Sequence, residues 1–161
     1  MTARLRSGLV AGFVSAALLL ATAPASAGPT DIELKLAKSE SGPFNDRIRR
    51  NVPLGEKRNV YLRAKNVEMG TLAVNLFSPG SQEDYRMKYF KLNGNNITER
   101  VTEPFGFVFN VQGGKAKKFR MQIKAKDGTA SECIYPNAIF DGGDDTAVVD
   151  VNLPMNVACV L

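Results

Sequence analysis

The sequence contains no histidine, no tryptophan and only two cysteines in 161 residues. Histidine is the commonest general base and a frequent zinc ligand, so its absence excludes Ser-His-Asp and Cys-His catalysis. The Ser-x-x-Lys spacing of serine–lysine catalysis is also absent. Carboxylate pairs such as Glu99 and Glu103 have turn or basic residues beside them, which is typical of solvated charges. The sequence predicts a protein that is not an enzyme and has no cofactor.

The lack of tryptophan also bears on carbohydrate binding, which commonly uses exposed aromatic rings. The nine phenylalanines fall mostly at apolar positions of alternating segments. Tyr85, Met87 and Tyr89 share one face of such a segment, which favours a place in the core. A sugar-binding platform is therefore not indicated.

Long apolar runs are scarce, and the one that stands out lies at the N-terminus. Arg4 and Arg6 precede an apolar run over residues 9–23, and a small-x-small site ending at Ala27 follows. This order predicts a secretory signal peptide cleaved after Ala27. The run is shorter than the roughly 20 apolar residues of a membrane-spanning helix. We therefore expect a secreted, extracellular protein, not an integral membrane protein, with one domain over residues 28–161.

The charged residues are unevenly distributed along the predicted mature chain. Residues 28–126 hold 19 basic and 10 acidic residues, whereas residues 127–161 hold six acidic residues and no basic residue. Opposite charges on neighbouring strands can neutralise each other. A protein that coats nucleic acid would more often be basic throughout.

The two cysteines, Cys133 and Cys159, predict a single disulfide, because an even number of cysteines in an exported chain usually pairs. A catalytic thiol or a metal-binding pair would be the alternatives, and neither has a histidine to work with. Closing a loop of this size stabilises a fold by roughly 3 kcal/mol on the chain-entropy estimate.

Apolar residues recur at every second position in several segments, while helical periodicity is nearly absent. Turn signals separate these segments at residues 78–81, 93–96, 112–114, 126–128 and 141–145. About seven short strands with this spacing predict an all-β fold, a single antiparallel β-sandwich. The sets expected on inward faces are Ile32, Leu34 and Leu36; Val60, Leu62 and Ala64; Leu72, Val74 and Leu76; Phe105, Phe107, Phe109 and Val111; Ala147, Val149 and Val151.

The most basic stretch, residues 113–128, follows the same pattern. Phe119, Met121, Ile123 and Ala125 fall on one face, and the basic side chains that begin with Lys118 fall on the other. We interpret the stretch as the solvent-facing side of a half-buried strand. Binding to an anionic partner is compatible with this pattern and is not implied by it.

Two segments carry a resemblance to a known family. "VYLRAKNVEMGTLAVNLF", with Asn66 and Gly70 at its turn, resembles immunoglobulin-like modules of bacterial surface proteins of the CARDB-like type. "MKYFKLNGNNITERVT" is similar to a pattern of actinobacterial extracellular modules, and "TAVVDVNL" would be the closing strand. The resemblance covers roughly residues 57–152 and leaves residues 129–140 as an insertion. It implies an immunoglobulin-like fold used as a spacer, adhesion or accessory unit, without catalytic residues.

One loop is a candidate metal site. Asp141, Asp144 and Asp145 offer oxygen ligands on a glycine-rich loop that calcium could gather. The spacing matches no EF-hand, and acidic glycine-rich turns are frequent without a metal.

Two basic clusters are candidate anion-binding sites: Arg47, Arg49 and Arg50 in a predicted loop, and Lys115, Lys117 and Lys118. Two functions remain open. The first is a non-catalytic secreted protein that presents a surface to a protein or cell-envelope partner. The alternative is a binder of an anionic polymer, such as a cell-wall polymer, a membrane surface or nucleic acid. A contiguous basic patch favours the alternative, and dispersed or paired basic residues favour the first function.

Overall fold

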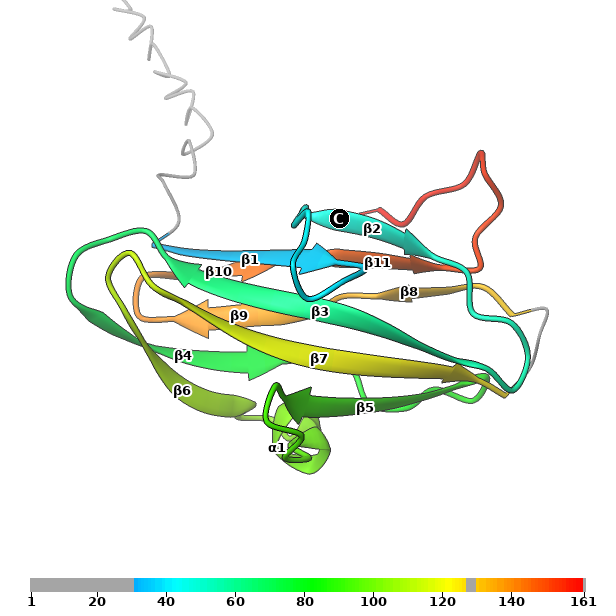
Figure 1. The fold of residues 1–161 in the computed structure, drawn as a ribbon, viewed down its shortest axis with the longest axis horizontal. Coiled ribbons are helices and arrows are strands. Elements are labelled where there is room, and N and C mark those ends of the chain that lie inside the picture. The colour runs from blue at the N-terminus through cyan, green and yellow to red at the C-terminus, as the bar shows by residue number, and fades with distance from the viewer. Residues whose placement is uncertain (1–30, 127–129, 161) are drawn as a thin grey trace, which may run out of the picture.

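A computed structural model describes residues 31–126 and 130–160 of the chain. Within them the chain forms eleven strands and one short helix, α1 (Thr98–Thr102) (Figure 1). The predicted all-β fold is confirmed, but the strands number eleven instead of about seven. Several of the additional strands have only three or four residues, which is too short for alternation to reveal. The predicted signal peptide over residues 1–27 lies outside the described residues.

The strands form three sheets. The first has the order β1-β3-β7-β5 and is antiparallel throughout, with strands β1 (Ile32–Ala37), β3 (Lys57–Asn66), β7 (Ala116–Ala125) and β5 (Tyr85–Lys91). The second, also antiparallel, consists of β10 (Gly143–Thr146), β9 (Asn137–Phe140), β4 (Thr71–Phe77) and β6 (Phe107–Gln112). The third consists of β2 (Arg47–Arg50), β11 (Val148–Val151) and β8 (Glu132–Ile134), and its β2–β11 pair is parallel.

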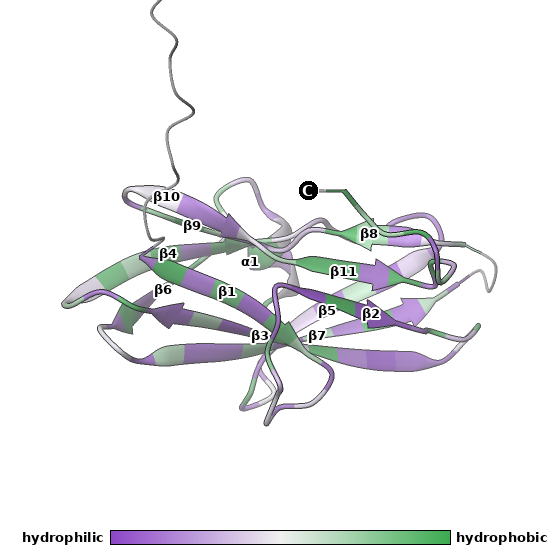
Figure 2. Cartoon of the chain, turned by 90° about the horizontal axis from the view of Figure 1, so that it is seen from above, coloured by the Kyte–Doolittle hydropathy of each residue, from purple (hydrophilic) through white to green (hydrophobic). Residues whose placement is uncertain are grey.

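The two four-stranded sheets lie face to face around one hydrophobic core (Figure 1, Figure 2). Figure 2 shows hydrophobic and hydrophilic residues alternating along the strands, as a half-buried sheet requires. The expected inward set of β7, which begins with Phe119, is buried. Phe119 packs edge-on against Phe107 and Phe109 of the opposite sheet, with ring centroids 5.8 and 4.8 Å away. Phe105 was expected inside and is 83% exposed, because the chain is still in a loop before β6 begins.

The third sheet is joined to the second by one kinked hairpin. β8 leads into β9 through Tyr135 and Pro136, and β10 leads into β11 through Ala147, whose N–H donates to the Pro136 carbonyl. β9 pairs with both β4 and β10, so it is an inner strand of its sheet. Within residues 129–140, the segment expected as an insertion, β8 and β9 thus each supply a strand to a sheet.

β11 is buried on both faces, since it lies between β2 and β8. The predicted inward residues Val149 and Val151 are buried, and so are Val148 and Asp150 on the other face. Asp150 is only 2% exposed. A buried carboxylate needs partners, and these are supplied by β2 and the C-terminal segment, as described below.

The outer edge of β5 is closed by side-chain hydroxyls. Ser81 Oγ accepts a hydrogen bond from the Met87 N–H, and Thr98 Oγ1 accepts one from the Tyr89 N–H. Such capping satisfies donors that would otherwise pair with another chain. The edge is thus occupied, and the exposed surface of this sheet is its outer face.

Candidate functional site

The outer face of the first sheet is densely basic. Alternation places one set of side chains of β1, β3, β7 and β5 outward, and nine of them are basic. Glu33 is the only acidic residue on this face among the paired positions of the four strands. We call the nine residues the basic face: Lys35, Lys57, Arg63, Lys65, Arg86, Lys88, Lys118, Arg120 and Lys124.

Strand register brings these charges side by side. Lys124 of β7 pairs with Lys57 of β3 and with Arg86 of β5, so three positive side chains form one row across the sheet. Lys118 pairs in the same way with Arg63. Like charges directly opposite each other destabilise a sheet. The arrangement therefore costs stability in the free protein.

Two arginines of this face lie over aromatic rings. The Arg63 guanidinium carbon is 4.6 Å from the centroid of the Phe44 ring, and that of Arg120 is 4.7 Å from the centroid of the Phe90 ring. The Nε atoms of both arginines are buried without a hydrogen-bond partner among the described residues. These cation–π contacts hold each guanidinium beside a ring, while its terminal amino groups have no hydrogen-bond acceptor among the described residues.

The loop of residues 38–46 bounds the basic face at one point. Phe44 of this loop lies within 5.4 Å of Lys118 Nζ, measured to the ring centroid, and Lys118 Nζ donates to the Glu40 carbonyl at 3.0 Å. Lys118 is thus partly engaged. Among the described residues, this loop makes no hydrogen bond, ion pair or cation–π contact with the rows that follow Lys118 toward Lys124.

Few carboxylates compensate these charges. The described residues contain three ion pairs, and only one of them, Lys35 with Asp46 at 3.8 Å, involves the basic face. The pair of Arg58 with Glu56 and the pair of Arg49 with Asp150 lie off it. Eight of the nine basic residues therefore have no ion-pair partner within the described part of the chain.

The surface is hollowed at the Lys124 end of the basic face. A cavity of about 470 Å³ there is lined by Leu54, Gly55, Ser81, Arg86, Lys124, Ala125 and Lys126. A second cavity, of about 460 Å³, shares Arg86 with it and also includes Lys88 and Arg100. Both lie beside the basic rows.

The outer face of the second sheet is different in charge. Its outward side chains on β4 and β6 are uncharged, and they include Ala73, Asn75, Val108 and Asn110. Ile139 of β9 continues this surface at 43% exposure. The two outer faces of the sandwich thus differ in character: one is positive and the other largely neutral.

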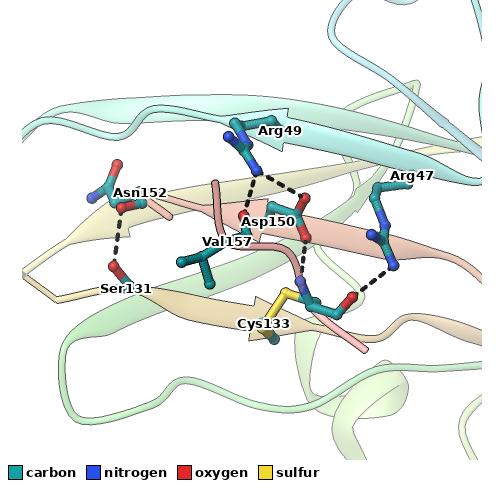
Figure 3. Close-up of polar contacts among 8 residues, drawn as sticks. Arg47, Arg49, Ser131, Cys133, Asp150, Asn152 and Val157 are labelled. Atoms are coloured by element: carbon teal, nitrogen blue, oxygen red, sulfur yellow. Dashed lines mark hydrogen bonds and ion pairs between the residues drawn. A yellow bond between two sulfur atoms is a disulfide. The ribbon is translucent and has the colours of Figure 1, made fainter. Parts of the chain in front are cut away.

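The predicted arginine cluster has a structural role instead. Arg47 and Arg49 lie on β2, and both reach the C-terminal segment (Figure 3). Arg47 Nη2 donates to the Cys159 carbonyl at 2.7 Å, and Arg49 Nη2 donates to the Val157 carbonyl at 2.5 Å. Arg49 also lies 3.9 Å from Asp150, whose Oδ1 accepts the Cys159 N–H at 3.2 Å. These contacts hold the C-terminal segment against the third sheet.

The remaining predicted basic residues are not gathered into one site. Burial, followed by the positive charge of Arg58, lowers the pKa of Arg50. Lys115, in the β6–β7 turn, and Lys117, near the start of β7, are exposed, and this turn lies at the opposite end of the molecule from β2 (Figure 1). The structure therefore does not bring the two predicted clusters together, and of their members only Lys118 belongs to the basic face.

The predicted calcium ligands are also separated. Asp144 and Asp145 lie on β10, where alternation points them to opposite faces. Asp144 Oδ2 accepts from Asn137 Nδ2 at 3.1 Å, and Asp145 Oδ2 accepts the Leu34 N–H at 2.7 Å. Burial raises the pKa of Asp145. No group of three acidic or cysteine side chains that could hold a metal ion, Asp141 included, is present among the described residues.

The structure joins Cys133 on β8 to Cys159 in a disulfide, with the Cα atoms 5.7 Å apart. A disulfide indicates an oxidising compartment. Across residues 31–126 and 130–160, none of the helical structure has the length and apolar character needed to cross a bilayer.

Sequence reasoning missed the basic face because it treated each basic stretch by itself. The available signal was that three segments, 57–65, 86–88 and 118–126, each place basic residues at alternate positions. What the sequence does not state is that these three strands are neighbours.

No family model and no curated protein matches the sequence. Solved structures with a similar strand arrangement include a family 123 glycoside hydrolase from Clostridium perfringens. Its TM-score is 0.49, with 10% identity over 76% of this chain, and this chain spans 27% of that protein's length. A PapD-like domain of human CEP192 has a TM-score of 0.46 and 12% identity over 91% of this chain and 94% of its own. A FixG-related protein from Vibrio parahaemolyticus has a TM-score of 0.43 and 11% identity over 77% of this chain and 99% of its own.

Proposed function

We propose that this protein is a secreted, non-catalytic β-sandwich module that binds an anionic polymer on its basic face. The observation that carries the proposal is the density of unpaired positive charge on one flat surface. Nine basic residues share the outer face of the first sheet, and only Lys35 has an ion-pair partner in the described part of the chain. Charge of one sign on one surface attracts an oppositely charged partner over distance.

The rows of like charge are unfavourable in the free protein. Like charges in the row of Lys57, Lys124 and Arg86 repel one another across the sheet. A bound polyanion would turn that repulsion into attraction and would release counterions. The Arg120 guanidinium already has a cation–π contact with Phe90, so we expect less side-chain entropy to be lost when an anionic oxygen binds it.

A polymer suits this surface better than a small ligand. The charges extend along the whole sheet, so one small anion would meet only a few of them, whereas a linear polyanion could contact several at once. The predicted signal peptide and the disulfide support export, so the polymer would be an extracellular one. The missing histidine supports a binding role without catalysis.

A second candidate function is docking to a protein or cell-envelope partner through the opposite face. It is favoured by the uncharged surface around Val108 and Ile139, which are 49% and 43% exposed. In such a function the basic face would be dispensable, and variants there would leave partner binding unchanged.

The test is retention of the full-length mature protein on an immobilised polyanion, such as phosphocellulose, over a series of salt concentrations. Replacing both Arg120 and Lys124 by Gln removes two contacts and lowers the slope of log affinity against log salt by about 1.4, at about 0.7 per contact. The matched control, Lys115→Gln with Lys117→Gln, removes the same charge away from the basic face and leaves the slope nearly unchanged. Equal losses in both double variants, or no retention of the parent protein at low salt, would overturn the proposal.

A further inference from the structure

The basic face is ordered into rows along β7. On the outer face of this strand, side chains recur every second residue, about 6.8 Å apart. Each of five successive rows contains at least one basic residue from β3, β7 or β5. The rows are centred on Ala116, Lys118, Arg120, Gln122 and Lys124.

The rows without a basic residue of β7 are completed by the neighbouring strands. Gln122 is uncharged, but it pairs with Lys88 of β5. Ala116 pairs with Lys65 of β3. No row is skipped, so positive charge repeats with the period of the strand itself. The loop of residues 38–46 contacts the Lys118 row, which leaves the rows of Arg120, Gln122 and Lys124 as an open run.

This period selects among anionic polymers. One repeat of a strand is two residues, and each residue contributes three backbone bonds: N–Cα, Cα–C and C–N. The repeat therefore contains about six backbone bonds. A phosphodiester chain with three carbons between successive phosphates has the same number of backbone bonds in each repeat. When both chains are extended, their repeats are therefore of similar length, and successive phosphates can meet successive rows without accumulating a mismatch.

We propose that the ligand of the basic face is a linear phosphodiester polymer with three carbons between phosphates, bound along β7 with one phosphate at each row of the open run. The inference rests on the proposed function and names the chemical class of its ligand. Polyol phosphates and single-stranded nucleic acids share this backbone chemistry.

The aromatic rings of the site do not favour recognition of bases or sugars. The Phe90 and Phe44 rings each have a guanidinium over one face. Gln122 Nε2 lies 3.4 Å from Asn59 Oδ1, so the amides in the middle row are directed at each other. Apart from Tyr61, which pairs with Arg120 on this face, the groups left to meet a ligand in these rows are cationic, and they fit the backbone of a polymer better than its substituents.

The first experiment varies the phosphate spacing at constant charge. The mature protein is titrated with three fluorescent probes that have equal numbers of phosphates: inorganic polyphosphate, poly(propanediol phosphate) and poly(hexanediol phosphate). Losing one contact through mismatch costs about fourfold in affinity at about 0.15 M salt. We expect the propanediol probe to bind at least that much more tightly than both of the others.

The outcomes separate the inference from the proposed function. If affinity falls steadily as the spacing between phosphates increases, so that polyphosphate binds most tightly, the inference is overturned and polyanion binding stays intact. No binding of any probe at low salt would overturn both. A fourth probe, oligothymidylate with the same number of phosphates, distinguishes the sources. Affinity equal to that of the propanediol probe supports recognition of the shared backbone, and much tighter binding would show that bases are recognised, against the inference.

The second experiment tests the rows in the protein. Gln122→Lys adds a charge in the middle of the open run and should steepen the salt dependence for the propanediol probe by about 0.7. The matched control is Asn110→Lys, which adds the same charge to the exposed outer face of β6 on the other sheet. A steepening equal in the two variants would contradict binding along β7.

Discussion

Removing the disulfide tests how the C-terminal segment is attached. The perturbation is the double substitution Cys133→Ser and Cys159→Ser. The bond links β8 to a segment that otherwise depends on hydrogen bonds, including those from Arg47 to the Cys159 carbonyl and from the Cys159 N–H to Asp150. We expect the variant to keep the fold, because the core strands do not need the bond, and to be less stable.

The magnitude follows from the separation of the two cysteines, which is 26 residues. In the chain-entropy relation a loop of this length contributes about 3.5 kcal/mol at 25 °C, by restricting the unfolded chain. Domains of this size are stabilised by about 5–15 kcal/mol in total. The disulfide is therefore expected to supply a large fraction of the free energy of unfolding.

Urea unfolding followed by circular dichroism measures the loss. At a slope of about 1–3 kcal/mol per molar urea, the midpoint should fall by at least about 1 M. The parent protein in excess reductant is the control and should unfold at the midpoint of the double variant. A loss below about 1 kcal/mol would refute the reasoning, because the loop-closure term alone exceeds it.

Three further predictions concern buried groups and backbone geometry. Tyr89→Phe removes the hydroxyl that contacts Ser78 Oγ at 2.6 Å and the Pro79 carbonyl at 3.2 Å. The free energy of unfolding in urea should fall by about 1–3 kcal/mol, because the Ser78 hydroxyl stays buried and loses this partner. Burial raises the pKa of Tyr89, so the unfolded chain ionises first, and stability should fall as pH rises past about 10 in the parent and less so in Tyr89→Phe. Burial also raises the pKa of Asp145, so its ionisation opposes folding above the unfolded value near about 3.9. Asp145→Asn should be more stable than Asp145→Ala at pH 7, because it keeps an acceptor for the Leu34 N–H. Any advantage of Asp145→Asn over the parent at pH 7 should shrink as pH falls toward about 4 and be gone below it. Gly106→Ala should lower the free energy of unfolding, measured by thermal unfolding, by about 1–3 kcal/mol, because a Cβ there would lie 2.7 Å from the Leu76 carbonyl oxygen. The control Gly55→Ala should lose less, because Gly55 has a similar positive φ but open space around the added Cβ.

Much of the fold could be predicted because alternation reports burial directly. Phe119 and Met121 are inside and Lys118 is outside, as the period of a strand requires. Alternation fails where a strand is buried on both faces or where a segment only precedes a strand. β11 with its buried Asp150 is an example of the first case, and Phe105 is an example of the second.

The candidate site could not be predicted, because it depends on which strands are neighbours. Residues 57 and 124 are far apart in the sequence, and only the pairing of β3 with β7 makes them adjacent. The arginines of β2 illustrate the converse error. They resembled a free anion-binding loop, but a parallel pair with β11 places them against the C-terminal carbonyls. Long-range pairing decides both cases, and local pattern does not encode it.

The cost of the basic face gives a final prediction that joins stability to function. Lys124 lies opposite both Lys57 and Arg86. Like charges directly opposite each other destabilise a sheet, and cross-strand pairs act on the scale of about 0.2–1 kcal/mol. Lys124→Gln should therefore raise the free energy of unfolding at low salt, while it weakens polyanion binding. The gain should shrink in about 1 M salt, where charges are screened within about 3 Å.

The matched control for that prediction is Lys117→Gln, because Lys117 lies on the same strand but opposite Ala64, with no like charge beside it in the sheet. It should change stability little at any salt concentration. If Lys124→Gln raises the free energy of unfolding and weakens polyanion binding, Lys124 favours the bound partner and destabilises the free fold. If Lys124→Gln were as neutral as Lys117→Gln at low salt, the repulsion would be absent, and the argument that the basic face is built for an anionic ligand would lose its energetic support.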